Sequence, residues 1–515
     1  MGRDARIVGV STFIGLTALW LVVTLTTGRL TEWPRFADDA FYYFYVAENV
    51  WRGWGLSMDG LHTTNGFQPL WMLVCLGLFR LPLDARTTVV AAIQVIDFAL
   101  VGVIAALLWQ SARRVGGVRA AVMVLGLLGW PRFVNLLLGG MESAVTLLAA
   151  LLAFRELSAG PSLSETGPTR RDATVGFLLA MLMLGRLDSV WIAFAIAALY
   201  AIRAMRDQTV AWWTRLRITV RKGLSVFWPV LALVVPYLLW NRTMFGAFVP
   251  ISGVLKTTFP HPGVYVGPLR ENVELVAMLG LGTLGLAATW RDDEAAPVSR
   301  VHAAFLVGAF VHLAYTTLFM NWAVLSGHFV TYQLVGFVGL ALLVRAVERR
   351  IRPLPGLVVA GFVAMMLAGL AYSVTKGDPT FRPAAEQGAA FAVDHLPADA
   401  VFAMKDSGAF SYYSQRRVVN LDGIISSREY QEALCQGTFE AHLRAAGVTH
   451  IVQHAVPKPG YRVYRQQYPC HLPGGSGAFL DLDERTEIFR SDDYGSGGGR
   501  SRLAIWTAPW ARGGR

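Results

Sequence analysis

The sequence predicts a polytopic α-helical membrane protein that carries a small α/β domain at its C-terminal end. Of the 515 residues, 54% are hydrophobic and only 16% are charged, and the mean hydropathy is +0.44. Soluble domains carry about 25% charged residues, so this composition indicates a membrane protein. The net charge of +11 does not indicate a nucleic-acid partner, because Lys and Arg cluster in short loops between apolar runs.

Apolar runs recur along the chain up to residue 375, and a spanning helix needs about 20 such residues. The first run lacks a small-residue cleavage site and exceeds the apolar core of a signal peptide, so we expect it to be retained. The run 67–80 is short and contains Pro69, which predicts an interfacial or re-entrant helix, with a twelfth span as the alternative. The eleven predicted spans are 7–27, 88–110, 120–138, 141–156, 173–186, 189–203, 224–241, 272–290, 301–320, 329–347 and 354–375.

The basic residues predict the orientation of these spans. With the N-terminus in the cytoplasm, roughly twenty basic residues fall in inner loops and about ten in outer loops, as the positive-inside rule requires. Counting 67–80 as a full span would move Arg113, Arg114 and Arg119 outside, so eleven spans are favoured. We therefore expect a plasma-membrane protein with a transmembrane domain over 1–375 and an extracytoplasmic domain over 376–515.

The C-terminal part has the mixed composition of a small α/β domain. Strand-like runs at 400–404, 417–420 and 449–453 alternate with helix-like stretches at 384–395 and 429–447. The glycine run 495–499 has no strand–helix context, which predicts a flexible loop rather than a phosphate cradle.

Cys435 and Cys470 are the only cysteines of this domain. In an oxidising compartment they are expected to form a disulfide, which would close a loop of about 35 residues. The alternative is two unrelated buried cysteines.

The first predicted outer loop, 28–87, holds the adjacent acids Asp38 and Asp39 in an aromatic-rich segment. Two carboxylates close to a membrane repel each other and lose hydration, which raises their pKa and suits a general base. The alternative for one of them is a helix cap, because Asp is a preferred N-cap and a helix is predicted from about Ala40.

Further polar residues fall on the same predicted outer side. Lys256 offers a positive charge to a phosphate at headgroup level, or else it is a lysine that touches lipid headgroups. Arg186 and Asp188 lie at a break between two spans, where a charged pair is either functional or structural. The remaining candidates are Asn65, Glu142, which could instead interact with the dipole of the following helix, and His328. Their common side indicates one site.

Several chemistries lack their sequence signals. The chain has no Gly-rich nucleotide loop, no Cys/His zinc spacing and no Ser nucleophile elbow. A soluble nucleotide-sugar donor is therefore not expected, and a donor resident in the membrane fits better.

The motifs resemble those of the GT-C superfamily of polytopic glycosyltransferases. ADDAFYYFYVAENVWRGWGLSMDG at 37–60 and TTNGFQPLW at 63–71 are similar to a bacterial branch that includes mycobacterial arabinofuranosyltransferases acting on arabinogalactan. GGMES, GRLDS, FGAFVPISGVLK and the His328 region follow in the same order. The segment KDSGAFSYYSQRRVVNLDGIISSREY at 405–430 resembles the outer domain of related proteins.

This resemblance implies an inverting transfer of a sugar from a polyprenyl-phosphate donor to an extracytoplasmic glycan, lipid or protein hydroxyl. It implies a base at Asp38 or Asp39 and a donor-phosphate contact at Lys256, assisted by Arg186 or His328. It also allows a divalent cation at Asp39, since some relatives use one. It does not fix the sugar.

Two other functions fit a membrane protein of this kind. A lipid-linked sugar flippase or exporter would also need polar groups along its path, whereas the predicted inner loops carry only topology charges. A catalytically inactive glycan-binding protein is the second alternative, and the presence of both Asp38 and Asp39 weighs against it.

Overall fold

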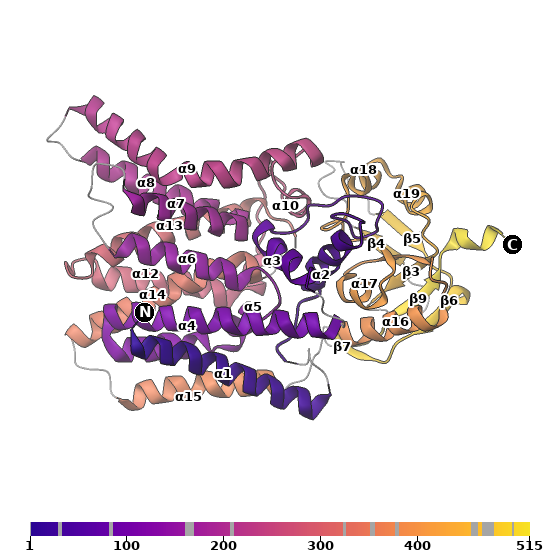
Figure 1. The fold of residues 1–515 in the computed structure, drawn as a ribbon, viewed down its shortest axis with the longest axis horizontal. Coiled ribbons are helices and arrows are strands. Elements are labelled where there is room, and N and C mark those ends of the chain that lie inside the picture. The colour runs from indigo at the N-terminus through magenta and orange to yellow at the C-terminus, as the bar shows by residue number, and fades with distance from the viewer. Residues whose placement is uncertain are drawn as a thin grey trace.

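The computed structural model shows a bundle of long helices and a C-terminal domain that lies at one end of the bundle (Figure 1). The structure describes residues 2–28, 33–81, 86–159, 169–206, 211–322, 326–350, 356–375, 381–454, 462–465, 478–496 and 499–514. The helices before the C-terminal domain are α1 (Arg3–Thr27), α2 (Asp38–Trp51), α3 (Pro69–Phe79), α4 (Arg86–Leu128), α5 (Pro131–Leu137), α6 (Ser143–Ser158), α7 (Arg170–Gly185), η2 (Leu187–Ser189), α8 (Val190–Arg206), α9 (Trp212–Phe245), α10 (Ile251–Lys256), α11 (Gly267–Glu271), α12 (Val273–Thr289), α13 (Ala296–Phe319), η3 (Ser326–Phe329), α14 (Val330–Arg350) and α15 (Gly356–Thr375).

Six helices within the described part of the chain are long and apolar enough to cross a membrane: α1, α4, α9, α13, α14 with η3, and α15. Helices α6, α7, α8 and α12 coincide with further predicted spans but have 16 or 17 residues each. The run 120–138 is divided between α4, which ends at Leu128, and α5, which begins at Pro131. Gly116 and Gly117 interrupt α4 between the predicted spans 88–110 and 120–138. The count of eleven spans therefore stays a prediction.

The short run 67–80 forms α3, a helix of 11 residues that begins at Pro69. This length is well below the roughly 20 residues needed to span the hydrocarbon core, as the short apolar run predicted. In Figure 1, α2, α3 and α10 lie where the long helices meet the C-terminal domain. The first predicted outer loop therefore forms helical structure at this junction.

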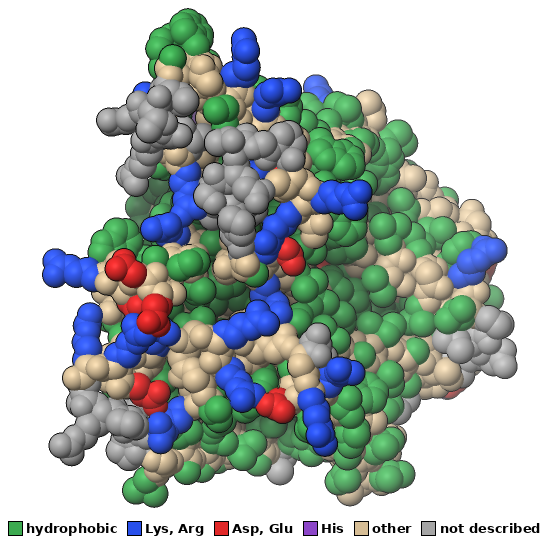
Figure 2. Space-filling view, turned by 60° about the vertical axis from the view of Figure 1, so that its left-hand side comes forward, with side chains coloured by type: hydrophobic (Ala, Val, Ile, Leu, Met, Phe, Trp, Pro, Cys, Tyr) green, Lys and Arg blue, Asp and Glu red, His purple; other side chains and the backbone are tan. Residues whose placement is uncertain are grey.

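The end of the bundle that lies away from the C-terminal domain is rich in basic side chains, which Figure 2 shows in blue. Arg113 pairs there with Asp4 of α1, and Arg119 pairs with Glu348 at 3.2 Å. Arg345 near the end of α14 pairs with Asp292 at 2.7 Å. Arg113 and Arg119 therefore lie at the same end as the N-terminus, which is the arrangement that the predicted orientation requires. The side of the membrane on which this end lies stays a prediction.

The C-terminal domain is built on a five-stranded sheet in the order β2-β1-β3-β9-β6. Strand β1 is parallel to β2 and β3, whereas β9 is antiparallel to β3 and β6. The elements are α16 (Arg382–His395), β1 (Val401–Met404), α17 (Gly408–Ser414), β2 (Arg417–Asn420), α18 (Arg428–Gln436), α19 (Phe439–Ala445), β3 (His450–Gln453), β4 (Arg462–Arg465), β5 (Ala478–Asp481), η4 (Glu484–Thr486), β6 (Glu487–Arg490), β7 (Tyr494–Ser496), β8 (Gly499–Ser501), β9 (Ala504–Thr507) and η5 (Pro509–Gly514). The predicted α/β domain is confirmed.

Two local expectations in this domain were wrong. The predicted helix 429–447 is two helices, α18 and α19, because Gly437 adopts a left-handed conformation with φ of 72° and ends α18. In the glycine run 495–499, which was expected to be a loop, residues 495, 496 and 499 belong to strands β7 and β8, which pair as an antiparallel ribbon, and residues 497–498 lie outside the described residues. Cys435 lies in α18, and Cys470 lies outside the described residues, so the disulfide stays a prediction.

The C-terminal domain and the segment 28–87, the first predicted outer loop, share one hydrophobic core. Buried residues of α2 and α3 pack there with buried residues of α16, α17 and the sheet. The rings of Phe41 and Phe44 in α2 lie 5.6 and 5.9 Å from that of Tyr412 in α17, measured between centroids. Because aromatic contacts of this kind bury large areas, they fix α2 against the domain.

Candidate active site

A cavity of about 770 Å³ lies where the bundle, α2, α10 and the C-terminal domain meet. Six residues that the sequence predicted for a site line it, although they come from five separate segments of the chain. These residues are Asp39, Glu142, Arg186, Asp188, Lys256 and His328. The structure therefore brings these six residues to one cavity, whereas Asp38 and Asn65 of the predicted set are not among its lining residues.

The turn before α6 places Glu142 in the wall of this cavity. Gly140 adopts a positive φ of 72°, which glycine tolerates without strain. Its N–H donates to the Asp97 carboxylate at 3.0 Å, and its carbonyl accepts from the indole N–H of Trp71 at 2.9 Å. These two bonds fix the turn, and α6 then begins at Ser143 with Glu142 as its N-cap residue.

Arg186 projects from a break between α7 and α8. Helix α7 ends at Gly185, Arg186 has an extended backbone (φ −154°, ψ 116°), and the short helix η2 follows before α8. A Cβ on Gly185 would lie 2.7 Å from the Thr146 hydroxyl of α6, so glycine permits the close approach of these two segments. The break therefore brings Arg186 beside Glu142.

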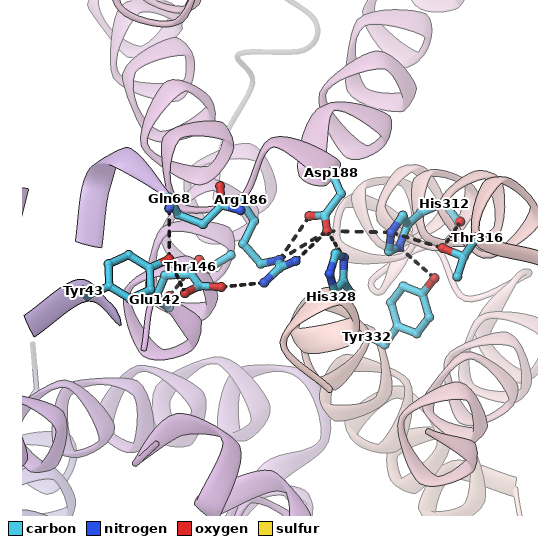
Figure 3. Close-up of polar contacts among 10 residues, drawn as sticks. All are labelled: Tyr43, Gln68, Glu142, Thr146, Arg186, Asp188, His312, Thr316, His328 and Tyr332. Atoms are coloured by element: carbon cyan, nitrogen blue, oxygen red, sulfur yellow. Dashed lines mark hydrogen bonds and ion pairs between the residues drawn. The ribbon is translucent and has the colours of Figure 1, made fainter. Parts of the chain in front are cut away.

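A chain of polar contacts joins these residues (Figure 3). Arg186 donates to Glu142 at 2.5 Å and, from two nitrogens, to Asp188 at 3.0–3.3 Å. Tyr43 donates to the other oxygen of Glu142 at 3.0 Å, and Nδ1 of His328 lies 2.9 Å from Asp188. The charge of Arg186 is thus matched by two carboxylates. Its position suits it to hold Glu142 and Asp188 in place.

Asp39 and Lys256 differ from that network. Both line the cavity and are partly exposed, and neither side chain makes a hydrogen bond or ion pair with any residue that the structure describes. Burial raises the pKa of Asp39 to about 7, and the charge of Lys256 opposes this rise while Asp406, Asp422 and Glu142 add to it. Burial also lowers the pKa of Lys256, against the attraction of Asp39. An unpaired carboxylate with a pKa near neutrality is suited to general base catalysis.

The structure separates the two acids of the predicted pair. The Asp38 carboxylate is turned to the C-terminal domain, where its two oxygens accept the N–H groups of Gly408 and Ala409, each at 2.8 Å. It is not among the residues that line the cavity. Asp38 thus does act at a helix N-terminus, but the helix is α17 and not the one near Ala40. Of the two acids, only Asp39 lines the cavity.

Asn65 also has a different place from the predicted one. Its amide donates to the side-chain oxygen of Asn241 at 2.9 Å, and its oxygen accepts the N–H of Ile251 at 3.0 Å. The side chain is fully buried and does not line the cavity. Because Ile251 is the first residue of α10, Asn65 positions the helix that ends in Lys256.

The sequence analysis missed several cavity residues. Arg132 donates to Asn272 at 3.1 Å and to Ser326 at 2.9 Å while it lines the cavity. An arginine inside the predicted span 120–138 was the available signal. The other residues of this kind are Arg35, Tyr42, Tyr43 and His312. The aromatic residues gave no signal, because a ring on an apolar helix is more often part of the core.

One group of side chains in the described residues has the composition of a metal site. The ligand atoms of Asp188, His312 and His328 lie within 4.8 Å of one another, and Asp39 is not part of the group. Asp188 already binds the guanidinium of Arg186 through the same oxygen that faces both histidines. A cation would have to compete with that guanidinium, so the geometry does not fit a bound metal well. The divalent cation suggested for Asp39 is likewise without support from this cluster.

Comparisons with known proteins identify the fold class. A family model described as a domain of unknown function, DUF8728, matches residues 379–494. A search of curated proteins finds no similar sequence. The structure of ArnT from Cupriavidus metallidurans bound to undecaprenyl phosphate is similar, with a TM-score of 0.51, 12% identity, and coverage of 95% of this chain and 98% of that one. The protein is thus a polytopic membrane protein of the GT-C fold class with a C-terminal α/β domain.

Two further solved structures give weaker matches. ArnT in the apo state has a TM-score of 0.49 and 13% identity, with coverage of 96% of this chain and 98% of that one. The archaeal oligosaccharyltransferase AglB from Archaeoglobus fulgidus, in complex with an inhibitory peptide and a dolichol-phosphate, has a TM-score of 0.45 and 12% identity. That match covers 92% of this chain and 74% of AglB.

Proposed function

We propose that the protein is an inverting glycosyltransferase that moves a sugar from a polyprenyl-phosphate donor to an extracytoplasmic hydroxyl. The observation that carries this proposal is that the Asp39 carboxylate and the Lys256 ammonium line the same cavity. Asp39 is a carboxylate with a pKa near 7, Lys256 is a cation that interacts with it electrostatically, and neither has a hydrogen bond or ion pair with the residues that the structure describes. A base and an anion-binding group in one partly apolar cavity are the two groups that this reaction needs.

In the proposed mechanism, Asp39 removes the proton of the acceptor hydroxyl as its oxygen attacks the anomeric carbon. The bond between this carbon and the phosphate oxygen breaks on the opposite face, which inverts the configuration. The polyprenyl phosphate leaves as a stable phosphate monoester, so no general acid is required. Loss of the base should lower the rate by about 10²–10⁴.

Positive charge stabilises the phosphate as its negative charge increases. Lys256 is the leading candidate for this role, because an ammonium can bind phosphate as a compact charge and this one has no partner among the described residues. Arg35 and Arg132 line the same cavity and add positive charge to it. Arg186 and His328 act mainly through the network that holds Asp188.

Two observations support a lipid-linked donor. The site lies at the end of a bundle in which six helices of the described residues are long and apolar enough to span a membrane. The similar ArnT structure is bound to undecaprenyl phosphate. The motif resemblance to arabinofuranosyltransferases makes a polyprenyl-phosphate arabinofuranose the first donor to test. A cell-envelope glycan or glycolipid is the proposed acceptor, reached from the extracytoplasmic side, with the N-terminus in the cytoplasm.

The test uses the purified full chain, a radiolabelled polyprenyl-phosphate sugar and envelope glycan from a strain that lacks the gene. We expect label to move to the glycan, and Asp39→Asn to abolish most transfer while undecaprenyl phosphate still binds. Asp394→Asn, at an exposed position of α16, is the control and should transfer normally. Movement of labelled lipid across vesicles without transfer would instead identify a flippase. Normal transfer by Asp39→Asn would refute the mechanism.

A further inference from the structure

The C-terminal domain has a buried polar junction with α2 at the edge of the cavity. The hydroxyl of Tyr42 accepts the N–H of Ser407 at 3.1 Å and the amide of Asn420 at 3.0 Å, and it donates to Asp422 at 3.2 Å. All three partners belong to the C-terminal domain and are buried. A hydroxyl with three hydrogen bonds has one preferred position, so the domain fixes the ring of Tyr42, which lines the cavity.

The loop after β2 then reaches the cavity itself. Ile424 and Ile425 line it, and the Thr64 hydroxyl donates to the Ser426 carbonyl at 3.0 Å. A Cβ on Gly66 would lie 2.0 Å from the carbonyl oxygen of Ile424, so the two backbones are in direct contact. The C-terminal domain therefore forms part of the cavity wall.

The cavity has two kinds of wall as a result. Among the described lining residues, the membrane domain contributes all the charged side chains, which include the cations Lys256, Arg132 and Arg35, whereas the C-terminal domain contributes the uncharged side chains of Ile424 and Ile425. Asp39 is affected electrostatically by both parts, by Lys256 of α10 and by Asp406 and Asp422 of the C-terminal domain. A donor phosphate is attracted to the cations of the membrane domain. In an inverting displacement the acceptor approaches from the other face of the sugar, and the uncharged surface that the C-terminal domain contributes is available to it.

We propose that the segment 422–426 of the C-terminal domain is the acceptor subsite, and that it takes a sugar unit of an envelope glycan. Ile424, the more exposed of the two isoleucines, contacts the apolar C–H face of that sugar, and the buried Ile425 anchors the segment in the hydrophobic core. This inference rests on the proposed function. It assigns a role to the domain that matches a family model described as a domain of unknown function.

The test compares Ile424→Ala with Val393→Ala, an exposed apolar residue of α16 that is remote from the cavity lining. Rates are measured with the full chain against the concentration of envelope glycan and, separately, of the polyprenyl-phosphate sugar. Because removing methylenes from an apolar contact changes discrimination by at least about tenfold, we expect the KM for glycan to rise by about that factor in Ile424→Ala alone. The KM for donor and the binding of undecaprenyl phosphate should not change.

An unchanged KM for glycan would overturn the subsite, and so would a loss of donor affinity in Ile424→Ala, whether from misfolding or from a donor contact. Ile424→Val keeps most of the contact and should restore most of the glycan affinity. Failure of the proposed function has a different signature, because the unchanged chain would then transfer no sugar at any glycan concentration.

Discussion

The carboxylate of Asp38 accepts the backbone N–H of Gly408 at 2.8 Å, across 370 residues of sequence. A second bond to Ala409 completes the contact, and a Cβ on Gly408 would lie 2.1 Å from the Asp38 carbonyl oxygen. An acid that the sequence analysis considered as a base thus attaches the C-terminal domain to α2 in the first predicted outer loop. Its neighbour Asp39 remains in the cavity.

This contact predicts that Asp38→Asn affects stability more than chemistry. An amide keeps one acceptor but presents its NH₂ group to the second backbone N–H, so a buried bond is lost at a cost of about 1–3 kcal/mol. We expect a lower thermal midpoint for the purified chain, whereas Asp39→Asn should unfold like the unchanged protein. The reverse order of stabilities would contradict this assignment.

The pKa of Asp39 predicts the pH dependence of transfer. A general base acts in its deprotonated form, so kcat/KM should rise with pH and level off above about 7. Lys256 lowers the pKa of Asp39, whereas Asp406, Asp422 and Glu142 raise it. Lys256→Met should therefore move the profile to higher pH. A profile that is flat across this range, or that moves to lower pH in the variant, would exclude Asp39 as the titrating group.

Lys256 also predicts a change in donor binding. Lys256→Met removes the unpaired cation, so undecaprenyl phosphate should bind more weakly and its affinity should depend less on salt. Lys256→Arg should restore only part of the affinity, because a planar guanidinium meets phosphate in a different geometry. Equal affinities for the unchanged chain and the Met variant would favour a lysine that only touches lipid headgroups.

Arg186 predicts a structural effect. It is buried between Glu142 and Asp188, so Arg186→Met leaves two carboxylates without their cation and should cost about 3–5 kcal/mol of stability. Arg428→Met, which breaks an exposed pair with Glu432, is the matched control and should change stability little. Thermal unfolding in detergent measures both. If the two variants lose equal stability, the buried network does not hold the site together.

Much of the architecture was predictable because its causes are local. Apolar runs gave the helices of the bundle, and Pro69 marked the start of α3. Strand β2 matches its predicted bounds at Arg417–Asn420, since a short β-branched run needs few distant contacts to be recognised. The errors in the C-terminal domain concern glycines, whose backbone conformation depends on the surrounding structure.

The sequence by itself determined which residues were available for a site. The two acids, Lys256 and Arg186 could be recognised from the sequence, and their predicted common side was enough to expect a single site. The direction of each side chain could not be predicted from the sequence. Asp38 and Asp39 are adjacent on one helix, so their side chains leave it about 100° apart, and only the packing of α2 decides which of them meets the cavity.

Only the tertiary structure decided that Asp38 binds α17, that Asn65 holds α10, and that a loop of the C-terminal domain closes the cavity. The contact of Asn65 with Ile251 joins residues that are 186 positions apart, and the contact of Asp38 with Gly408 joins residues that are 370 positions apart. No periodicity or local motif encodes such a partner. The reason is physical, because a buried polar group is satisfied by whichever donor or acceptor the packed core brings to it, and that core forms from the whole chain at once.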